Sequence, residues 1–314
     1  STLMRSSAAS DVYKRQFIGN GTDVCLPRAV DNPVRWVYTP NPDCYLLKSD
    51  SLIVRVDLST ASITYLDKEG GLLLQEDQNI PRISEKRVTK QVIYDEHSKH
   101  IEKTADGDKE IKNVLRYDTI GHTWKYRINF KWQPLEALYG WGSHMEDYMN
   151  LRGKELYLCQ HNLKAMVPVL NSTAGYGLLF DAGCAMMFKD NSEGSFVELE
   201  AAKQIDYYFM KGKTMDAVVA NYRMLTGNSP MMPLYLFGYI QSKERYVSSD
   251  DLINTLKEYR QRQIPIDMIV QDWNYWPEGQ WGNMSMNPKF YPDKRKLADE
   301  IHSLHAKLMI SIWP

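Results

Sequence analysis

Residues 264–276 read IPIDMIVQDWNYW, and this stretch decides the fold. Residues 266–271 are nearly all apolar, as expected for a short strand covered on both faces in a parallel sheet. Asp272 follows this strand directly, and an aromatic run follows the aspartate. In parallel α/β sheets and barrels, functional groups gather just beyond the carboxyl ends of the strands. The stretch therefore predicts a buried parallel strand that ends at a candidate site.

The segments on either side alternate between strand and helix patterns. Two further strands are predicted at residues 234–241 and 308–313, and two helices at residues 249–262 and 292–305. Ser249 is the predicted N-cap of the first of these helices. A β-α-β-α-β order requires parallel strands joined by helical crossovers. Because no helix follows the last strand, we expect an α/β domain that continues beyond residue 314.

Upstream, residues 17 to about 211 have a sequence pattern typical of short β-strands. In residues 122–132 the large apolar side chains alternate with polar ones: Trp124, Tyr126, Ile128, Phe130 and Trp132 against Lys125, Arg127, Asn129 and Lys131. A period of two places the apolar face in a core and the charges in water. Many such strands, separated by Gly, Asn and Asp clusters, predict a β-sandwich. A helix pattern at residues 214–225 and a stop signal at residues 226–230 mark the domain boundary.

Composition excludes several classes of function. The 314 residues are 43% hydrophobic and 25% charged, with a formal net charge of −1. Such a chain has no overall attraction to nucleic acid or to an anionic membrane surface. No apolar stretch approaches the roughly 20 residues that cross a bilayer. We therefore expect neither a nucleic-acid partner nor a membrane partner.

Metal and nucleotide sites also lack support. The four cysteines are scattered without a CxxC pair, at Cys25, Cys44, Cys159 and Cys184. Their spacing leaves a disulfide open in an oxidising compartment, but small buried hydrophobic residues are the better interpretation. The seven histidines show no HxH or HExxH spacing, and no Gly-rich phosphate loop follows a strand. The sequence therefore predicts no metal and no cofactor.

The first sixteen residues do not fit the pattern that follows them. Residues 1–16 are rich in Ser, Ala and Arg, and they lack the apolar core of a secretory signal peptide. Residues 5–16 resemble a translated cloning adapter. We interpret residues 1–16 as a non-native or disordered lead, so the sequence does not reveal the cellular location.

The loop after residue 271 has the composition of a sugar-binding site. Three of the chain's eight tryptophans lie between Asp272 and Trp281, interleaved with Asp, Asn, Glu and Gln. Aromatic rings offer flat faces to the C–H surfaces of sugars, while carboxylates and amides bind hydroxyls. Two alternatives stay open: the tryptophans fill the core, or Asp272 and Glu278 are themselves a catalytic pair.

Several segments, in this order, resemble one enzyme family. Residues 233–242, 264–276, 287–293 and 308–314 resemble the first three barrel strands of glycoside hydrolase family 31 and their loops. Residues 138–142, 149–153 and 171–181 are similar to the N-terminal domain of that family in order and spacing. One such motif is weak evidence, whereas several in sequence are strong evidence.

The resemblance implies the domain organisation. Residues 17–212 are expected to form a galactose-mutarotase-like β-sandwich, and residues 213–232 a linker helix and loop. Residues 233–314 are expected to form the first three strands of a (β/α)8 TIM barrel, which is incomplete within this sequence.

The resemblance also implies a retaining α-glycosidase that removes terminal α-linked xylose or glucose from oligosaccharides. The aspartates that serve as nucleophile and acid/base follow the fourth and sixth barrel strands, so both are expected beyond residue 314 and the chain alone is expected to be inactive. Asp272 matches a sugar-binding aspartate and Trp313 a position in the pocket wall. Trp273 and Trp276 flank the aspartate, and we expect all four side chains to bind substrate.

Residues 241–246 and 151–163 resemble α-xylosidases in particular, whereas Ser143 to Glu146 depart from many members of the family. Two other classes of protein stay open. One is a non-catalytic carbohydrate-binding or scaffold protein, and the other is an α-galactosidase-type barrel enzyme. The sequence does not decide among xylose, glucose and galactose, nor does it give the oligomeric state.

Overall fold

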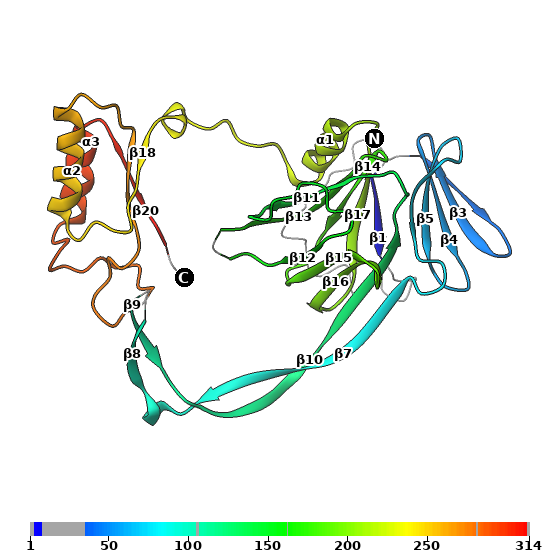
Figure 1. Ribbon diagram of the computed structural model, residues 1–314, viewed down its shortest axis with the longest axis horizontal. Coiled ribbons are helices and arrows are strands. Elements are labelled where there is room, and N and C mark those ends of the chain that lie inside the picture. The colour runs from blue at the N-terminus through cyan, green and yellow to red at the C-terminus, as the bar shows by residue number, and fades with distance from the viewer. Residues whose placement is uncertain (1–2, 8–34, 105–106, 162, 281, 313–314) are drawn as a thin grey trace. The chain divides into compact units, whose positions relative to one another are not determined.

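The computed structural model describes residues 3–7, 35–104, 107–161, 163–280 and 282–312 (Figure 1). The chain divides into two compact units. The first unit comprises residues 1–91 and 119–229, and the second comprises residues 92–118 and 230–314.

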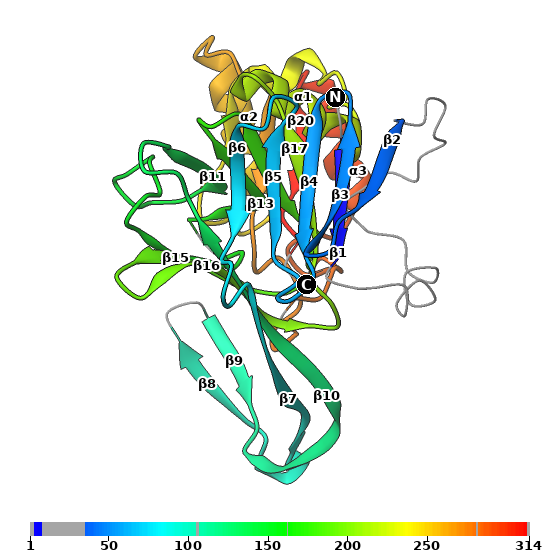
Figure 2. The same cartoon turned by 90° about the vertical axis from the view of Figure 1, so that its right-hand side faces the viewer.

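Two antiparallel sheets form the first unit. A five-stranded sheet has the order β1-β17-β14-β13-β11, and its strands are Leu3–Ser7, Asp206–Lys211, Tyr176–Phe180, Ala165–Ser172 and Leu138–Ser143. The second sheet has the order β12-β15-β16-β10-β6-β5-β4-β3-β2, with β7 paired to β10. In the same order, its strands are Glu155–Leu158, Met186–Asn191, Gly194–Ala202, Val114–Lys131, Leu72–Glu76, Ile63–Asp67, Leu52–Asp57, Cys44–Ser49 and Trp36–Pro40, and β7 is Arg82–Tyr94. Figure 2 shows β3, β4, β5 and β6 side by side.

The apolar faces of the two sheets share one core. Tyr65 of β5 stacks on Phe209 of β17 with ring centroids 3.9 Å apart, and both side chains are buried. On β10, Ile128 and Phe130 are buried, as the alternating pattern predicts. The observed structure is mostly antiparallel β-sheet and agrees with the predicted β-sandwich.

Helix α1 (Met215–Thr226) covers the outer face of the five-stranded sheet, where Val218 and Leu225 pack against strand residues. Thr214 caps the helix by accepting a hydrogen bond from the Ala217 N–H at 3.2 Å. Close contact requires glycine beneath the helix, because a Cβ on Gly177 would lie 2.4 Å from Val218 Cγ1. The helix and its end agree with the sequence pattern.

Part of the segment 1–16, which was expected to be non-native or disordered, forms a strand. Leu3–Ser7 forms β1 and pairs antiparallel with β17 in a register from Leu3↔Met210 to Ser7↔Asp206. Residues 8–16 lie outside the described part of the chain.

The second unit contains a parallel sheet with the order β18-β19-β20. Its strands are Ile240–Gln241, Met268–Gln271 and Lys307–Ile310, and its helices are α2 (Ser249–Gln261) and α3 (Lys294–Ser303). Residues 92–118 contribute a 3-10 turn, Glu96–Ser98, and the antiparallel pair β8 (His100–Thr104) and β9 (Gly107–Ile111). Among the described residues, no helix is long and apolar enough to span a membrane.

The predicted strand over residues 234–241 is wrong in its first half. Leu234–Phe237 forms a 3-10 turn, closed by hydrogen bonds from Leu236 N–H to Pro233 O and from Gly238 N–H to Tyr235 O. The reason is a lack of pairing, since β18 pairs with β19 only at Ile240 and Gln241. The N-cap of α2 is also one residue earlier than predicted, because the Ser248 hydroxyl accepts from the Asp251 N–H at 3.2 Å.

A polar group lies within the sandwich core. The Glu76 side chain is fully buried, and Arg82 Nη2 lies 2.6 and 2.7 Å from its two carboxylate oxygens. The Tyr207 hydroxyl donates to Glu76 Oε1 at 2.9 Å, and Tyr65 donates to the Tyr207 hydroxyl at 3.1 Å. Burial raises the pKa of Glu76, and the charge of Arg82 opposes this shift. These contacts join the two sheets through a buried charge that depends on its partners.

We expect Arg82→Ala to lower the free energy of unfolding at pH 7 by about 3–5 kcal/mol, because it leaves a buried carboxylate without a counter-ion. The loss should shrink near pH 4.5. A carboxyl group whose pKa is raised in the folded state favours folding most at low pH, where protonation removes the buried charge. Urea denaturation followed by far-ultraviolet circular dichroism at both pH values measures the effect.

Arg87→Ala is the matched control on the same strand. Arg87 Nη2 lies 3.5 Å from Glu85 Oε2 and both side chains are about half exposed, so the loss should stay below about 1 kcal/mol. Equal losses for the two variants would contradict a supporting role for Arg82.

Candidate functional site

The carboxyl ends of β18, β19 and β20 lie at one edge of the parallel sheet. Gln241 pairs with Ile269, and Gln271 pairs with Ile310, so the three strands run in register to this edge. The loops that leave it are residues 242–248 and 272–293. This is where the sequence predicts a site.

Asp272 is the first residue beyond β19, and it is half-buried. Its carbonyl oxygen accepts a hydrogen bond from Gln271 Nε2 at 3.1 Å. Within the described part of the chain, no hydrogen bond or ion pair engages its carboxylate. A half-buried carboxylate without a protein partner is suited to a ligand hydroxyl.

The aromatic run after Asp272 turns sharply at Asn274, whose φ of 56° lies in the left-handed region that asparagine tolerates. Beyond this turn, Tyr275 and Trp276 are 3% and 5% exposed and belong to the core of the second unit. Trp273 is half-buried, and its ring centroid lies 6.5 Å from that of Trp276. The alternative that the tryptophans fill the core therefore fits Trp276. Trp273, in contrast, is partly exposed beside Asp272.

The structure describes Glu278 but not Trp313, the two other residues considered for the site. Trp313 lies outside the described residues. Glu278 is exposed, in a turn where the Gln280 N–H donates to the Pro277 carbonyl at 3.1 Å. The binding roles of Asp272, Trp273, Trp276 and Trp313 stay predictions.

The sequence did not single out the buried polar floor of this site. Gln271 is fully buried, and its Nε2 also donates to the Tyr246 carbonyl at 3.1 Å. The Tyr291 hydroxyl lies 2.5 Å from the same carbonyl and 3.1 Å from Gln271 Oε1. The available signal was a lone glutamine in an otherwise apolar strand, since a buried amide requires partners.

Asp267 fixes the start of the sheet. Its carboxylate accepts from the Tyr239 N–H at 3.2 Å, and a Cβ on Gly238 would meet this carboxylate at 1.9 Å. After β18, Gln241 Oε1 accepts from Tyr259 at 2.7 Å and also from Tyr239. The hydroxyl of Tyr239, together with burial, raises the pKa of Tyr259 to about 12, so Tyr259 stays a hydrogen-bond donor.

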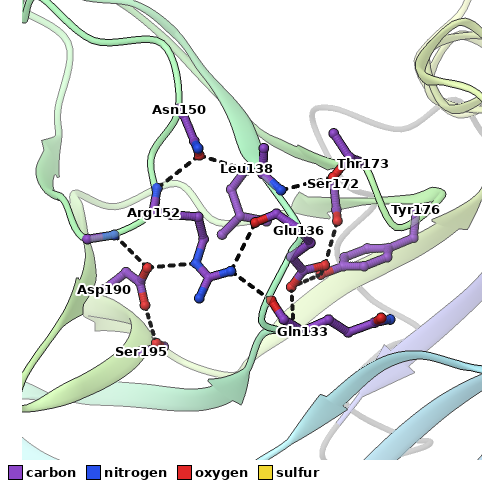
Figure 3. Close-up of polar contacts among 12 residues, drawn as sticks. Gln133, Glu136, Leu138, Asn150, Arg152, Ser172, Thr173, Tyr176, Asp190 and Ser195 are labelled. Carbon is purple, nitrogen blue, oxygen red and sulfur yellow. Dashed lines mark hydrogen bonds and ion pairs between the residues drawn. The ribbon is translucent and has the colours of Figure 1, made fainter.

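A second polar network lies in the first unit and joins the three sandwich segments singled out in the sequence (Figure 3). Arg152 Nε lies 2.9 Å from Asp190 Oδ2, and its Nη1 donates to the carbonyls of Gln133 and Glu136 at 2.8 and 3.0 Å. Asn150 Oδ1 accepts from the N–H groups of Leu138 and Arg152 at 3.2 Å.

The buried Glu136 carboxylate completes this network. It accepts from the Ser172 hydroxyl at 2.7 Å, the Tyr176 hydroxyl at 3.1 Å and the Gln133 N–H at 2.9 Å. Burial raises its pKa. Its hydrogen bonds tie the segment before β11 to β13 and β14, while Asn150 and Arg152 hold the loop that follows β11.

That loop starts from an unusual backbone. Gly140, Trp141 and Gly142 all have positive φ, and a Cβ on Gly142 would lie 1.9 Å from the Ala165 carbonyl oxygen. Trp141 itself is fully buried. In the divergent segment beyond, the Glu146 carboxylate lies 2.9 Å from His144 Nδ1 and 3.4 Å from Lys164 Nζ.

The described residues contain no group of three or more His, Cys, Asp or Glu side chains placed to hold a metal ion. Cys44, Cys159 and Cys184 are free thiols there, whereas Cys25 lies outside the described part of the chain. Cys44 is buried, and the other two are half-buried.

Comparison with known proteins finds similarity to family 31 glycoside hydrolases. The sequence model described as the glycosyl hydrolases family 31 TIM-barrel domain matches residues 229–314. An α-xylosidase of Saccharolobus solfataricus is 29% identical over 311 residues, which cover 96% of this chain and 38% of that protein.

Two solved structures share the fold. A family 31 α-xylosidase from a soil metagenome, solved with xylose, matches with a TM-score of 0.72 at 23% identity over 99% of this chain and 43% of that chain. A family 31 dextranase of Flavobacterium johnsoniae, solved with isomaltotriose, matches with a TM-score of 0.69 at 22% identity over 93% of this chain and 33% of that chain. The chain thus spans less than half the length of each of these proteins. Residues 229–314 thus match the family 31 barrel domain, and the chain is similar in sequence to an α-xylosidase and shares the fold of two family 31 enzymes.

Proposed function

We propose that this chain forms the sugar-holding part of a retaining α-glycosidase that removes terminal α-linked xylose or glucose from oligosaccharides. One observation carries the proposal. The Asp272 carboxylate, beside the half-buried Trp273 at the end of β19, has no partner among the described residues, and it lies in the segment that the family model matches. A carboxylate next to an aromatic face is the arrangement that binds a pyranose.

The domain organisation belongs to the same proposal. Residues 17–212 act as the N-terminal β-sandwich, residues 213–232 as the linker, and residues 233–314 as the first three strands of a (β/α)8 barrel. The parallel order β18-β19-β20, with helices between the strands, supports this assignment.

In the proposed mechanism, one carboxylate attacks the anomeric carbon while a carboxylic acid protonates the leaving oxygen, and water then releases the covalent intermediate. Asp272 holds ring hydroxyls and so orients the sugar, which is a positioning contribution. The nucleophile and the acid/base are expected outside residues 1–314.

The names of the relatives support xylose and glucose as the sugars. The related α-xylosidase structure contains xylose, and the related dextranase structure contains isomaltotriose. Xylose and glucose differ by one hydroxymethyl group, and whether the site accepts this group depends on the size of the pocket. In this proposal Trp313 forms part of the pocket wall, and Trp273 and Trp276 flank Asp272.

We expect Asp272→Ala to weaken binding of methyl α-D-xylopyranoside to the 314-residue chain by about 1.5–3 kcal/mol, because hydrogen bonds to a charged group are lost. Saturation-transfer nuclear magnetic resonance titrations measure the dissociation constant. Asp299→Ala removes an exposed carboxylate from α3 and serves as the control. Unchanged affinity in Asp272→Ala would contradict the proposed role of Asp272.

The same titrations with methyl α-D-glucopyranoside test specificity. If the pocket is shaped for xylose, the glucoside should bind more weakly by about 1–3 kcal/mol. Tighter binding of the glucoside would contradict the α-xylosidase assignment.

The 314-residue chain should not release 4-nitrophenol from 4-nitrophenyl α-D-xylopyranoside, because neither catalytic carboxyl group is expected within it. A colorimetric assay at high protein concentration provides the measurement. Turnover that disappears in both Asp272→Asn and Glu278→Gln would instead identify these two acids as the catalytic pair.

A further inference from the structure

Gln271 is the one polar side chain of β19, and it is fully buried among apolar neighbours. Both ends of its amide make hydrogen bonds. Nε2 lies 3.1 Å from the carbonyl oxygens of both Tyr246 and Asp272, and Oε1 lies 3.1 Å from the Tyr291 hydroxyl. A methionine would fill a similar volume without the cost of burying an amide, so these bonds are the reason for a polar residue.

Tyr291 braces this amide from the loop that precedes α3. Its hydroxyl proton serves two acceptors, the Tyr246 carbonyl at 2.5 Å and Gln271 Oε1 at 3.1 Å. The three side chains Gln271, Tyr246 and Tyr291 are each at most 2% exposed. The clamp, defined here as these three residues, therefore joins the loop after β18 to both ends of the loop after β19.

The clamp acts on the backbone of Asp272. Gln271 Nε2 holds the Asp272 carbonyl, while the Gln271 carbonyl accepts from the Ser311 N–H beyond β20 at 2.9 Å. Two residues later, Asn274 turns the chain in the left-handed region. These restraints act on the backbone from which the Asp272 side chain extends, and no described residue engages its carboxylate.

We propose that Gln271, braced by Tyr291, is a positioning residue that directs the Asp272 carboxylate toward the sugar. This inference rests on the proposed sugar-binding role of Asp272. A loop backbone held in place before binding loses less conformational freedom when the ligand arrives, so the clamp contributes to affinity without touching the sugar.

A double-mutant cycle on the 314-residue chain tests this proposal, with methyl α-D-xylopyranoside as the ligand. Gln271→Met should raise the dissociation constant about tenfold, as expected for the loss of hydrogen bonds that orient a binding group. In an Asp272→Ala background, Gln271→Met should change it less than about twofold, because the group that it directs is absent. Equal effects in the two backgrounds would overturn the proposal.

The cycle separates the two hypotheses. If Asp272→Ala leaves binding unchanged, the proposed function of Asp272 fails, and the inference fails with it. If Asp272→Ala weakens binding but Gln271→Met does not, only the positioning role is overturned.

Tyr291→Phe provides a milder variant in case Gln271→Met fails to fold. It removes one hydroxyl, and it should raise the dissociation constant about threefold when Asp272 is present and not in Asp272→Ala. Tyr275→Phe, the same change at a buried tyrosine outside the clamp, is the matched control. Equal effects of Tyr291→Phe and Tyr275→Phe would overturn the proposal, and near-ultraviolet circular dichroism of the tryptophans confirms that each variant is folded.

Discussion

The two sheets of the sandwich are joined by the buried carboxylate of Glu76 as well as by apolar packing. Arg82, Tyr207 and the Ile63 N–H all converge on it, so β6, β7, β17 and β5 are fixed by one charge. Apolar packing alone tolerates shifts of one sheet over the other, whereas a buried charge is stable only when each partner is in place. The stacked rings of Tyr65 and Phe209 then fill the space around it.

Where burial follows from a strict sequence period, the sequence predicted the structure well. The alternation in residues 122–132 predicted the buried Ile128 and Phe130 of β10, although Trp124 and Tyr126 are only half-buried, and the apolar run before Asp272 predicted β19. The one predicted N-cap, Ser249, lies one residue after the observed cap of α2, Ser248. Each of these features depends on residues close together in the chain.

Features that depend on distant partners were not predictable. Residues 234–237 have the composition of a strand, but pairing with β19 begins only at Ile240. The partners of Gln271 and Glu136 come from separate loops, so no local pattern reveals them. At the candidate site, the sequence identified Asp272 and its aromatic neighbours, but it could not show that Trp276 is largely buried while Trp273 is not.

The contact between Glu76 and Tyr207 spans 131 positions of the chain, and that between Tyr65 and Tyr207 spans 142. Contacts of such sequence separation form slowly, because a long segment must be ordered before they contribute. During synthesis, the strands that carry Glu76 and Tyr65 exist long before β17 is made. Until then, Glu76 and Tyr65 lack the partners that β17 supplies, and the incompletely covered sheet is open to association with other chains.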